Sequence, residues 1–191
     1  MEVYYHSDRA ERLQTGTVIE LEPYRPEEST LLLFRCCMDD AFLGHLTRLM
    51  REGISLHGAR YLLMPGHAPN YISLATELAY EAYRWKHEPG TVSRLQSLFA
   101  WRNLEDAVRF GKQARQGRIY RVRCSEGEKP LPYDMNGLKL SYDPEEQERY
   151  AERYWAGKPA SADADYKPCW EYLLRLPVTV LEEVTVNPIE V

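Results

Sequence analysis

The fold is decided by residues 93–111, which read SRLQSLFAWRNLEDAVRFG. Four apolar residues in a row, Leu98–Trp101, include two aromatic rings and predict a buried β-strand. Asn103 is a candidate N-cap, and two acidic residues follow it where the helix dipole favours negative charge. Apolar residues then recur at helical spacing over Leu104–Gly111. A strand that ends in aromatic rings and leads directly into a helix is typical of the floor of a small-molecule cleft.

Composition places the chain among ordinary globular proteins. It has 191 residues, 44% hydrophobic and 28% charged, which predicts one domain over residues 1–191 with a well-buried core. The net charge of −5 argues against a dedicated scaffold for duplex DNA. Adjacent Cys36 and Cys37 are poorly placed for a disulfide or a shared zinc ion, and neither a membrane span nor a signal peptide is evident. We therefore expect a cytoplasmic protein with reduced thiols, no metal and no membrane contact.

The remaining pattern predicts more strands than helices. Strands are expected at Glu2–His6, Thr17–Leu21, Arg118–Cys124, Cys169–Leu176 and Val178–Val186, and helices at Asp39–Glu52, Leu74–Trp85 and Pro144–Trp155. Glycine and proline predict a loop-rich segment over Arg51–Tyr71, with a short strand at Tyr61–Met64 as an option, and Leu31–Phe34 reads as the start of a strand or as part of a helical region. Because strands and helices do not alternate, we expect the α+β class with a mostly antiparallel sheet.

Three features in this order resemble the ADP-ribosyltransferase superfamily, in its histidine–aromatic–glutamate branch. They are a strand ending in His6, a strand bearing Phe99 and Trp101 ahead of a helix, and a late strand that begins Trp170–Leu174. The details are similar to a bacterial family catalogued as a domain of unknown function, DUF2441, over Tyr5–His6, Glu77–Arg84, Ser93–Ala100, Tyr154–Pro159 and Trp170–Leu173. The resemblance implies one ADP-ribosyltransferase-like domain, with a split antiparallel sheet and flanking helices.

The resemblance also implies chemistry on NAD⁺, which would be a substrate. The bond between nicotinamide and ribose would break through an oxocarbenium-like transition state, and ADP-ribose would pass to a protein, a nucleic acid or a small molecule. Glu171 would be the catalytic carboxylate beside the forming cation. The residues implied to bind NAD⁺ are His6 at a ribose hydroxyl or the phosphates, Phe99 or Trp101 stacked on nicotinamide, Ser93, and Arg94 at the diphosphate.

Several alternatives stay open at this point. His6 is equally a satisfied strand-end histidine, the two aromatic residues are more often core, and Arg94 pairs as readily with Glu77 or Glu81. The ring position is usually tyrosine in that branch, and Cys169 stands where arginine- or asparagine-directed transferases carry a second acid. The runner-up function is therefore an inactive module on the same fold that binds a nucleotide or a partner. A third reading is an interaction protein without a nucleotide site.

Overall fold

The structure is a computed structural model, and it describes residues 2–9, 11–26, 34–35, 38–63, 71–113 and 118–185. The chain divides into two compact units. The first unit comprises Met1–Glu20, Leu98–Leu138 and Arg153–Val191, and the second comprises Leu21–Ser97 and Lys139–Glu152. Each unit is therefore assembled from segments that lie far apart in the sequence. In the described ranges, no helix is both long enough and apolar enough to cross a membrane.

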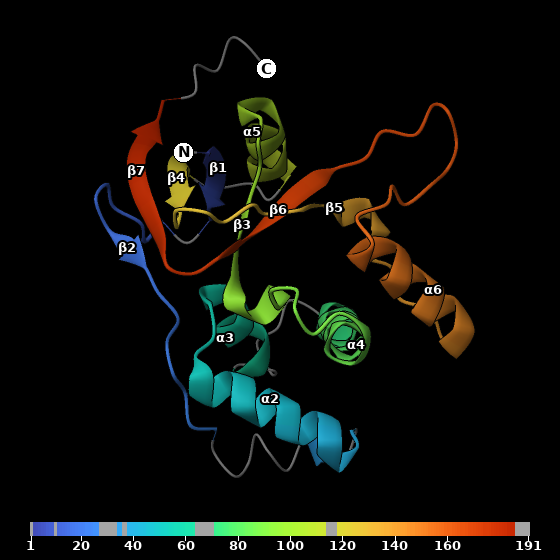
Figure 1. Cartoon of the computed structure of the whole chain (residues 1–191). Helices are drawn as coiled ribbons and strands as arrows, with labels where there is room; N and C mark the ends of the chain where they lie inside the picture. Colours follow the sequence, from blue (N-terminus) through green and yellow to red (C-terminus); the bar gives the residue numbers. More distant parts are fainter. Residues whose placement is uncertain are drawn as a thin grey trace. The chain divides into compact units, whose positions relative to one another are not determined.

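In the described part of the chain, the first unit holds two antiparallel sheets (Figure 1). The larger sheet has the strand order β1 (Val3–Asp8), β4 (Arg118–Cys124), β7 (Val178–Val184) and β2 (Val18–Ile19). The smaller sheet has the order β3 (Ser97–Ala100), β6 (Trp170–Arg175) and β5 (Pro132–Asp134). Both sheets are thus built from strands distant in sequence, with the amino-terminal strand β1 pairing along β4 from Val3↔Arg123 to Asp8↔Arg118.

An isolated antiparallel bridge connects β1 with the residue that follows β3. Tyr5 and Trp101 exchange two backbone hydrogen bonds of 2.8 Å. The Trp101 side chain packs in a core cluster with Ala107 and Val108 of helix α5 (Leu104–Gln113) and with Ile119 of β4. The aromatic stretch of the sequence is therefore where strands of the two sheets meet.

The second unit is helical in its described residues. It contains α2 (Asp40–Glu52), α3 (Leu56–Leu62), α4 (Tyr71–His87) and the short 3₁₀-helix η2 (Arg94–Gln96), and α6 (Pro144–Trp155) begins in it. Its core combines Leu46, Leu49 and Met50 of α2 with Leu62 of α3 and Leu95 of η2. The turn η2, which leads into β3, is thus part of this core.

Most of the expected elements are confirmed. The α+β class and the antiparallel pairing hold, and β4 and α6 have the predicted bounds. Helix α2 begins after its predicted N-terminal residue Asp39, whose carboxylate accepts a hydrogen bond of 2.8 Å from the backbone nitrogen of Phe42. Helix α4 is longer than predicted, and the segment after Leu98–Trp101 forms the expected helix.

Three expectations were wrong in detail. Strand β1 continues through His6 to Asp8, because pairing with β4 supplies its backbone partners to that point. Gly127, Pro130, Pro132 and Gly137 indicate a loop in the sequence, but this segment contains β5 and the 3₁₀-helix η3 (Met135–Gly137). The loop-rich segment after Arg51 contains α3, so that Tyr61 and Leu62 of the optional strand are helical and Leu63 forms a turn.

Helix α3 escaped prediction because Gly58 was taken for a chain breaker. A Cβ atom on Gly58 would lie 2.2 Å from the carbonyl oxygen of Leu95, so glycine permits close packing of α3 on η2. Ser55 caps the helix by accepting from the backbone nitrogen of Gly58 at 3.2 Å. The predicted feature at Leu31–Phe34 and the cysteine pair at residues 36–37 fall largely or wholly outside the described residues.

Candidate functional site

His6 lies on β1 and reaches across to β3. Its Nδ1 is 2.7 Å from the backbone carbonyl oxygen of Phe99. A carbonyl oxygen only accepts, so Nδ1 carries the proton and Nε2 of the neutral ring is an acceptor. Burial lowers the pKa of His6 below its usual value, against the opposing effect of that hydrogen bond. The ring is therefore neutral at physiological pH, with a defined tautomer.

The two aromatic candidates differ in their surroundings. Trp101 is 1% exposed, and its ring lies 4.4 Å from the ring of Phe110 within the core cluster. Phe99, two residues earlier on β3, is half-buried, as is His6. Of the two residues, only Phe99 thus keeps appreciable solvent-accessible surface.

Glu171 is a buried carboxylate on β6. It is 2% exposed, and its Oε1 accepts a hydrogen bond of 2.9 Å from the hydroxyl of Tyr154 on α6. Tyr133 of β5 pairs in register with Glu171, and the rings of Tyr133 and Tyr154 stack with centroids 5.1 Å apart. Trp155 packs edge-on against Tyr154. The carboxylate is thus placed among aromatic rings, with a phenolic donor on one oxygen.

The three strands that carry the candidates follow one another. β1 meets β3 through the Tyr5–Trp101 bridge and the His6–Phe99 hydrogen bond, and β3 is the neighbour of β6. Successive strand residues point to opposite faces, however, so Glu171 and Tyr172 face opposite sides of β6. Tyr172 packs on Tyr4, which shares a face of β1 with His6. The described contacts therefore join His6 to Phe99 and join Glu171 to Tyr154.

Ser93 and Arg94 belong to the second unit, at the start of η2. The Ser93 hydroxyl donates to Oε2 of Glu81 at 2.8 Å and accepts from the backbone nitrogen of Leu95 at 3.1 Å. Arg94 directs its Nε and Nη2 to the two carboxylate oxygens of Glu77, at 2.9 and 3.0 Å. Both side chains are buried, so the pairing of Arg94 with a glutamate of α4, which the sequence left open, is the arrangement found.

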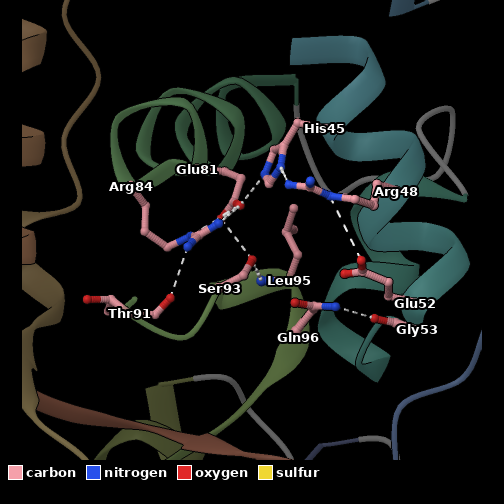
Figure 2. Close-up of polar contacts among 10 residues, drawn as sticks. All are labelled: His45, Arg48, Glu52, Gly53, Glu81, Arg84, Thr91, Ser93, Leu95 and Gln96. Carbon is pink, nitrogen blue, oxygen red and sulfur yellow. Dashed lines mark hydrogen bonds and ion pairs between the residues drawn. The ribbon is translucent and has the colours of Figure 1, made fainter. Parts of the chain in front are cut away.

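Glu81 is the centre of a buried polar network that links α2, α4 and the segment before η2 (Figure 2). Its Oε1 lies 2.8 Å from Nε2 of His45 and 2.6 Å from Nη2 of Arg84. His45 also stacks on Trp85, with ring centroids 5.0 Å apart. The network therefore holds α2, α4 and the segment before η2 together.

Glu77, one turn earlier on α4, carries a similar set of partners. Besides Arg94, its Oε1 lies 3.1 Å from Nε2 of His57 on α3. Burial alone would raise the pKa of Glu77, but the Arg94 guanidinium and His57 hold it well below its usual value. The carboxylate is therefore ionised and paired throughout the physiological range.

A family model described as "Protein of unknown function (DUF2441)" matches residues 4–186. The chain belongs to this family. The match covers segments of both units and all six residues that the sequence singled out for NAD⁺. No curated protein matches the chain.

In this DUF2441 protein, the structure adds residues to the candidate site that sequence reasoning missed. Tyr154 donates to Glu171 and Tyr133 pairs with it in register. On α4, the buried residues include the charged Glu77, Glu81 and Arg84 beside Leu74 and Tyr80. Two glutamates at i and i+4 beside apolar residues were the available signal, but charged residues are normally taken to face solvent. In the described ranges, no group of three His, Cys, Asp or Glu side chains is arranged to hold a metal ion.

Proposed function

We propose that the protein is an ADP-ribosyltransferase that cleaves NAD⁺ between nicotinamide and ribose. In this reaction the C–N bond breaks with its electron pair leaving on nicotinamide, and the acceptor forms a bond to the same ribose carbon while losing its proton. The proposal is supported by the succession of β1, β3 and β6, which bear His6, Phe99 and Glu171: a bridge joins β1 to the end of β3, and β3 is the neighbour of β6. Glu171 faces away from the side of β6 on which Tyr172 packs against Tyr4. The succession follows the histidine–aromatic–glutamate order in which these residues occur along the chain.

The chemical state of His6 favours one of its two proposed roles. A neutral imidazole whose Nδ1–H donates to the Phe99 carbonyl has Nε2 as a hydrogen-bond acceptor. An acceptor suits a ribose hydroxyl and does not suit a phosphate oxygen, which has no proton to give. We therefore assign His6 to a ribose hydroxyl of NAD⁺.

The proposed role of Phe99 rests on its exposure, and that of Glu171 on its carboxylate. Phe99 is the stacking ring for nicotinamide, because Trp101 is enclosed in the core. Glu171 is the catalytic carboxylate, whose negative charge in a low-dielectric site would stabilise the developing cation. Ser93 and Arg94 fix the turn that leads into β3, because their polar atoms are engaged by glutamates of α4.

The proposal is tested by incubating the purified protein with NAD⁺ and measuring free nicotinamide, with and without added protein or nucleic-acid acceptors. We expect Glu171→Gln to reduce release by at least about a hundredfold, as removal of an electrostatic stabiliser does in other enzymes. Glu182→Gln is the matched control, because Glu182 is an exposed glutamate on strand β7. Full activity of Glu171→Gln would exclude the proposed mechanism.

A non-catalytic module that binds a nucleotide or a partner is the second candidate. Two observations favour it. The Glu171 carboxylate already has a protein partner, the Tyr154 hydroxyl. Glu171 also faces the side of β6 opposite Tyr172, which packs on the Tyr4 and His6 face of β1. Titration calorimetry distinguishes the two functions. Saturable NAD⁺ binding without nicotinamide release from any acceptor supports the module, and binding with release supports the enzyme.

A further inference from the structure

The Tyr154–Glu171 hydrogen bond has the properties of a preorganising contact. Both side chains are at most 2% exposed, and the hydroxyl is 2.9 Å from Oε1. A hydrogen bond to a charged acceptor is stronger than one between neutral groups, and it strengthens further where water is excluded. The phenol therefore restricts the rotation of the carboxylate within β6.

Tyr154 is itself held in place by two ring contacts and a backbone hydrogen bond. Its ring stacks on Tyr133 at an interplanar angle of 25° and meets Trp155 edge-on at 83°. The helix that carries it ends at Trp155, and the backbone nitrogen of Gly157, whose φ of 65° is in the left-handed region, donates to the Tyr154 carbonyl at 2.9 Å. The hydroxyl of Tyr154 is therefore held in a defined position.

We propose that Tyr154 is a positioning residue for Glu171, fixing Oε1 so that the carboxylate is oriented before NAD⁺ binds; this inference rests on the proposed function. Preorganised groups accelerate a reaction because no reorientation is required as charge develops. Tyr154 has no part in bond breaking, and its effect passes entirely through Glu171. Its removal should therefore lower kcat and leave KM for NAD⁺ nearly unchanged.

The chain offers a matched control on the same helix. Tyr150 lies one turn before Tyr154 on α6 and also donates to a glutamate, Oε1 of Glu146, at 2.8 Å. Tyr150 and Glu146 are both half-buried, and neither is proposed to contact NAD⁺. The variants Tyr154→Phe and Tyr150→Phe thus remove the same group from the same kind of bond, and both keep the ring that packs.

The first measurement does not depend on activity. Side-chain carboxyl ¹³C resonances of the glutamates are recorded for both variants, with Glu171 assigned through Glu171→Gln. We expect Tyr154→Phe to shift the Glu171 resonance and Tyr150→Phe to leave it in place. A Glu171 resonance that is the same in Tyr154→Phe and in the unsubstituted protein would overturn the inference.

The second measurement is the rate of nicotinamide release. Tyr154→Phe is expected to lower kcat by about tenfold to a hundredfold, the effect of one hydrogen bond to a charged group, while Tyr150→Phe keeps the full rate. An unchanged kcat in Tyr154→Phe would refute the positioning role even if the resonance moves. If the unsubstituted protein releases no nicotinamide with any acceptor, the proposed enzymatic function fails, and the resonance alone decides whether Tyr154 orients Glu171.

Discussion

Arg94→Ala is the substitution whose effect on stability the structure defines best. The Arg94 and Glu77 side chains are 5% and 7% exposed, and two hydrogen bonds of 2.9 and 3.0 Å join them. Removal of the guanidinium leaves a buried carboxylate with His57 at 3.1 Å in place of its charged partner. Breaking a buried ion pair from one side costs about 3–5 kcal/mol of unfolding free energy.

The control is an exposed pair in the same unit. Arg48 and Glu52 on α2 lie 3.9 Å apart, and their side chains are 61% and 58% exposed. Water screens such an i,i+4 pair, so Arg48→Ala should cost no more than about 0.5 kcal/mol. The two arginine substitutions should therefore differ by several kcal/mol, although both remove one ion pair from the second unit.

Urea unfolding followed by circular dichroism measures this difference. If the unfolding free energy falls by about 2 kcal/mol per molar urea, Arg94→Ala should lower the urea concentration at the unfolding midpoint by about 1.5–2.5 M. Arg48→Ala should lower it by about 0.25 M or less. Adding Glu77→Gln to Arg94→Ala should cost less than the sum of the two single losses, because the second substitution removes the stranded charge. Equal midpoints for Arg94→Ala and Arg48→Ala would refute the reasoning that the buried pair fixes η2.

Three further outcomes are expected. Gly58→Ala should destabilise the protein by about 1–3 kcal/mol in urea unfolding, because its Cβ would clash with the Leu95 carbonyl, whereas Gly44→Ala on α2 meets open space. Gly157→Ala should lower the melting temperature measured by calorimetry, because φ is 65° and the Pro132 carbonyl lies 3.2 Å from the new Cβ; a loss no larger than that of Gly90→Ala would contradict this. Because folding lowers the pKa of Glu77 below its usual 4.5, the ionised carboxylate stabilises the protein fully at pH values above 4.5, and this stabilisation is lost as the pH falls toward the lowered pKa. The difference in unfolding free energy between the unsubstituted protein and Glu77→Gln should therefore narrow in urea titrations at acid pH.

Local signals in the sequence determined much of the secondary structure. The expected strand Arg118–Cys124 and the expected helix Pro144–Trp155 have correct bounds, because the strand period and helix-start residues such as Pro144 act over a few neighbours. The aromatic stretch Leu98–Trp101 was likewise correctly read as a strand that leads into a helix. In these segments, local preference and tertiary packing favour the same conformation.

Tertiary structure alone decided which polar groups are buried and with what. Gly58 is a packing glycine within a helix because the carbonyl of Leu95, in a turn distant in sequence, approaches it, and no local pattern contains that contact.

 The carboxylates of Glu77 and Glu81 face the interior because Arg94, Arg84 and their histidine partners compensate the loss of hydration, which a hydrophobicity pattern cannot register.

In the candidate site too, the sequence determined some features and the tertiary structure determined others. The residue types at His6, Phe99 and Glu171 were available from the sequence, and so was their order along the chain. The enclosure of Trp101, the tautomer of His6 and the bond from Tyr154 to Glu171 come from strand pairing and helix packing between segments that are distant in sequence. Sequence thus supplied the chemical groups of the site, and tertiary structure determined their protonation, exposure and partners, because these depend on neighbours that only folding brings together.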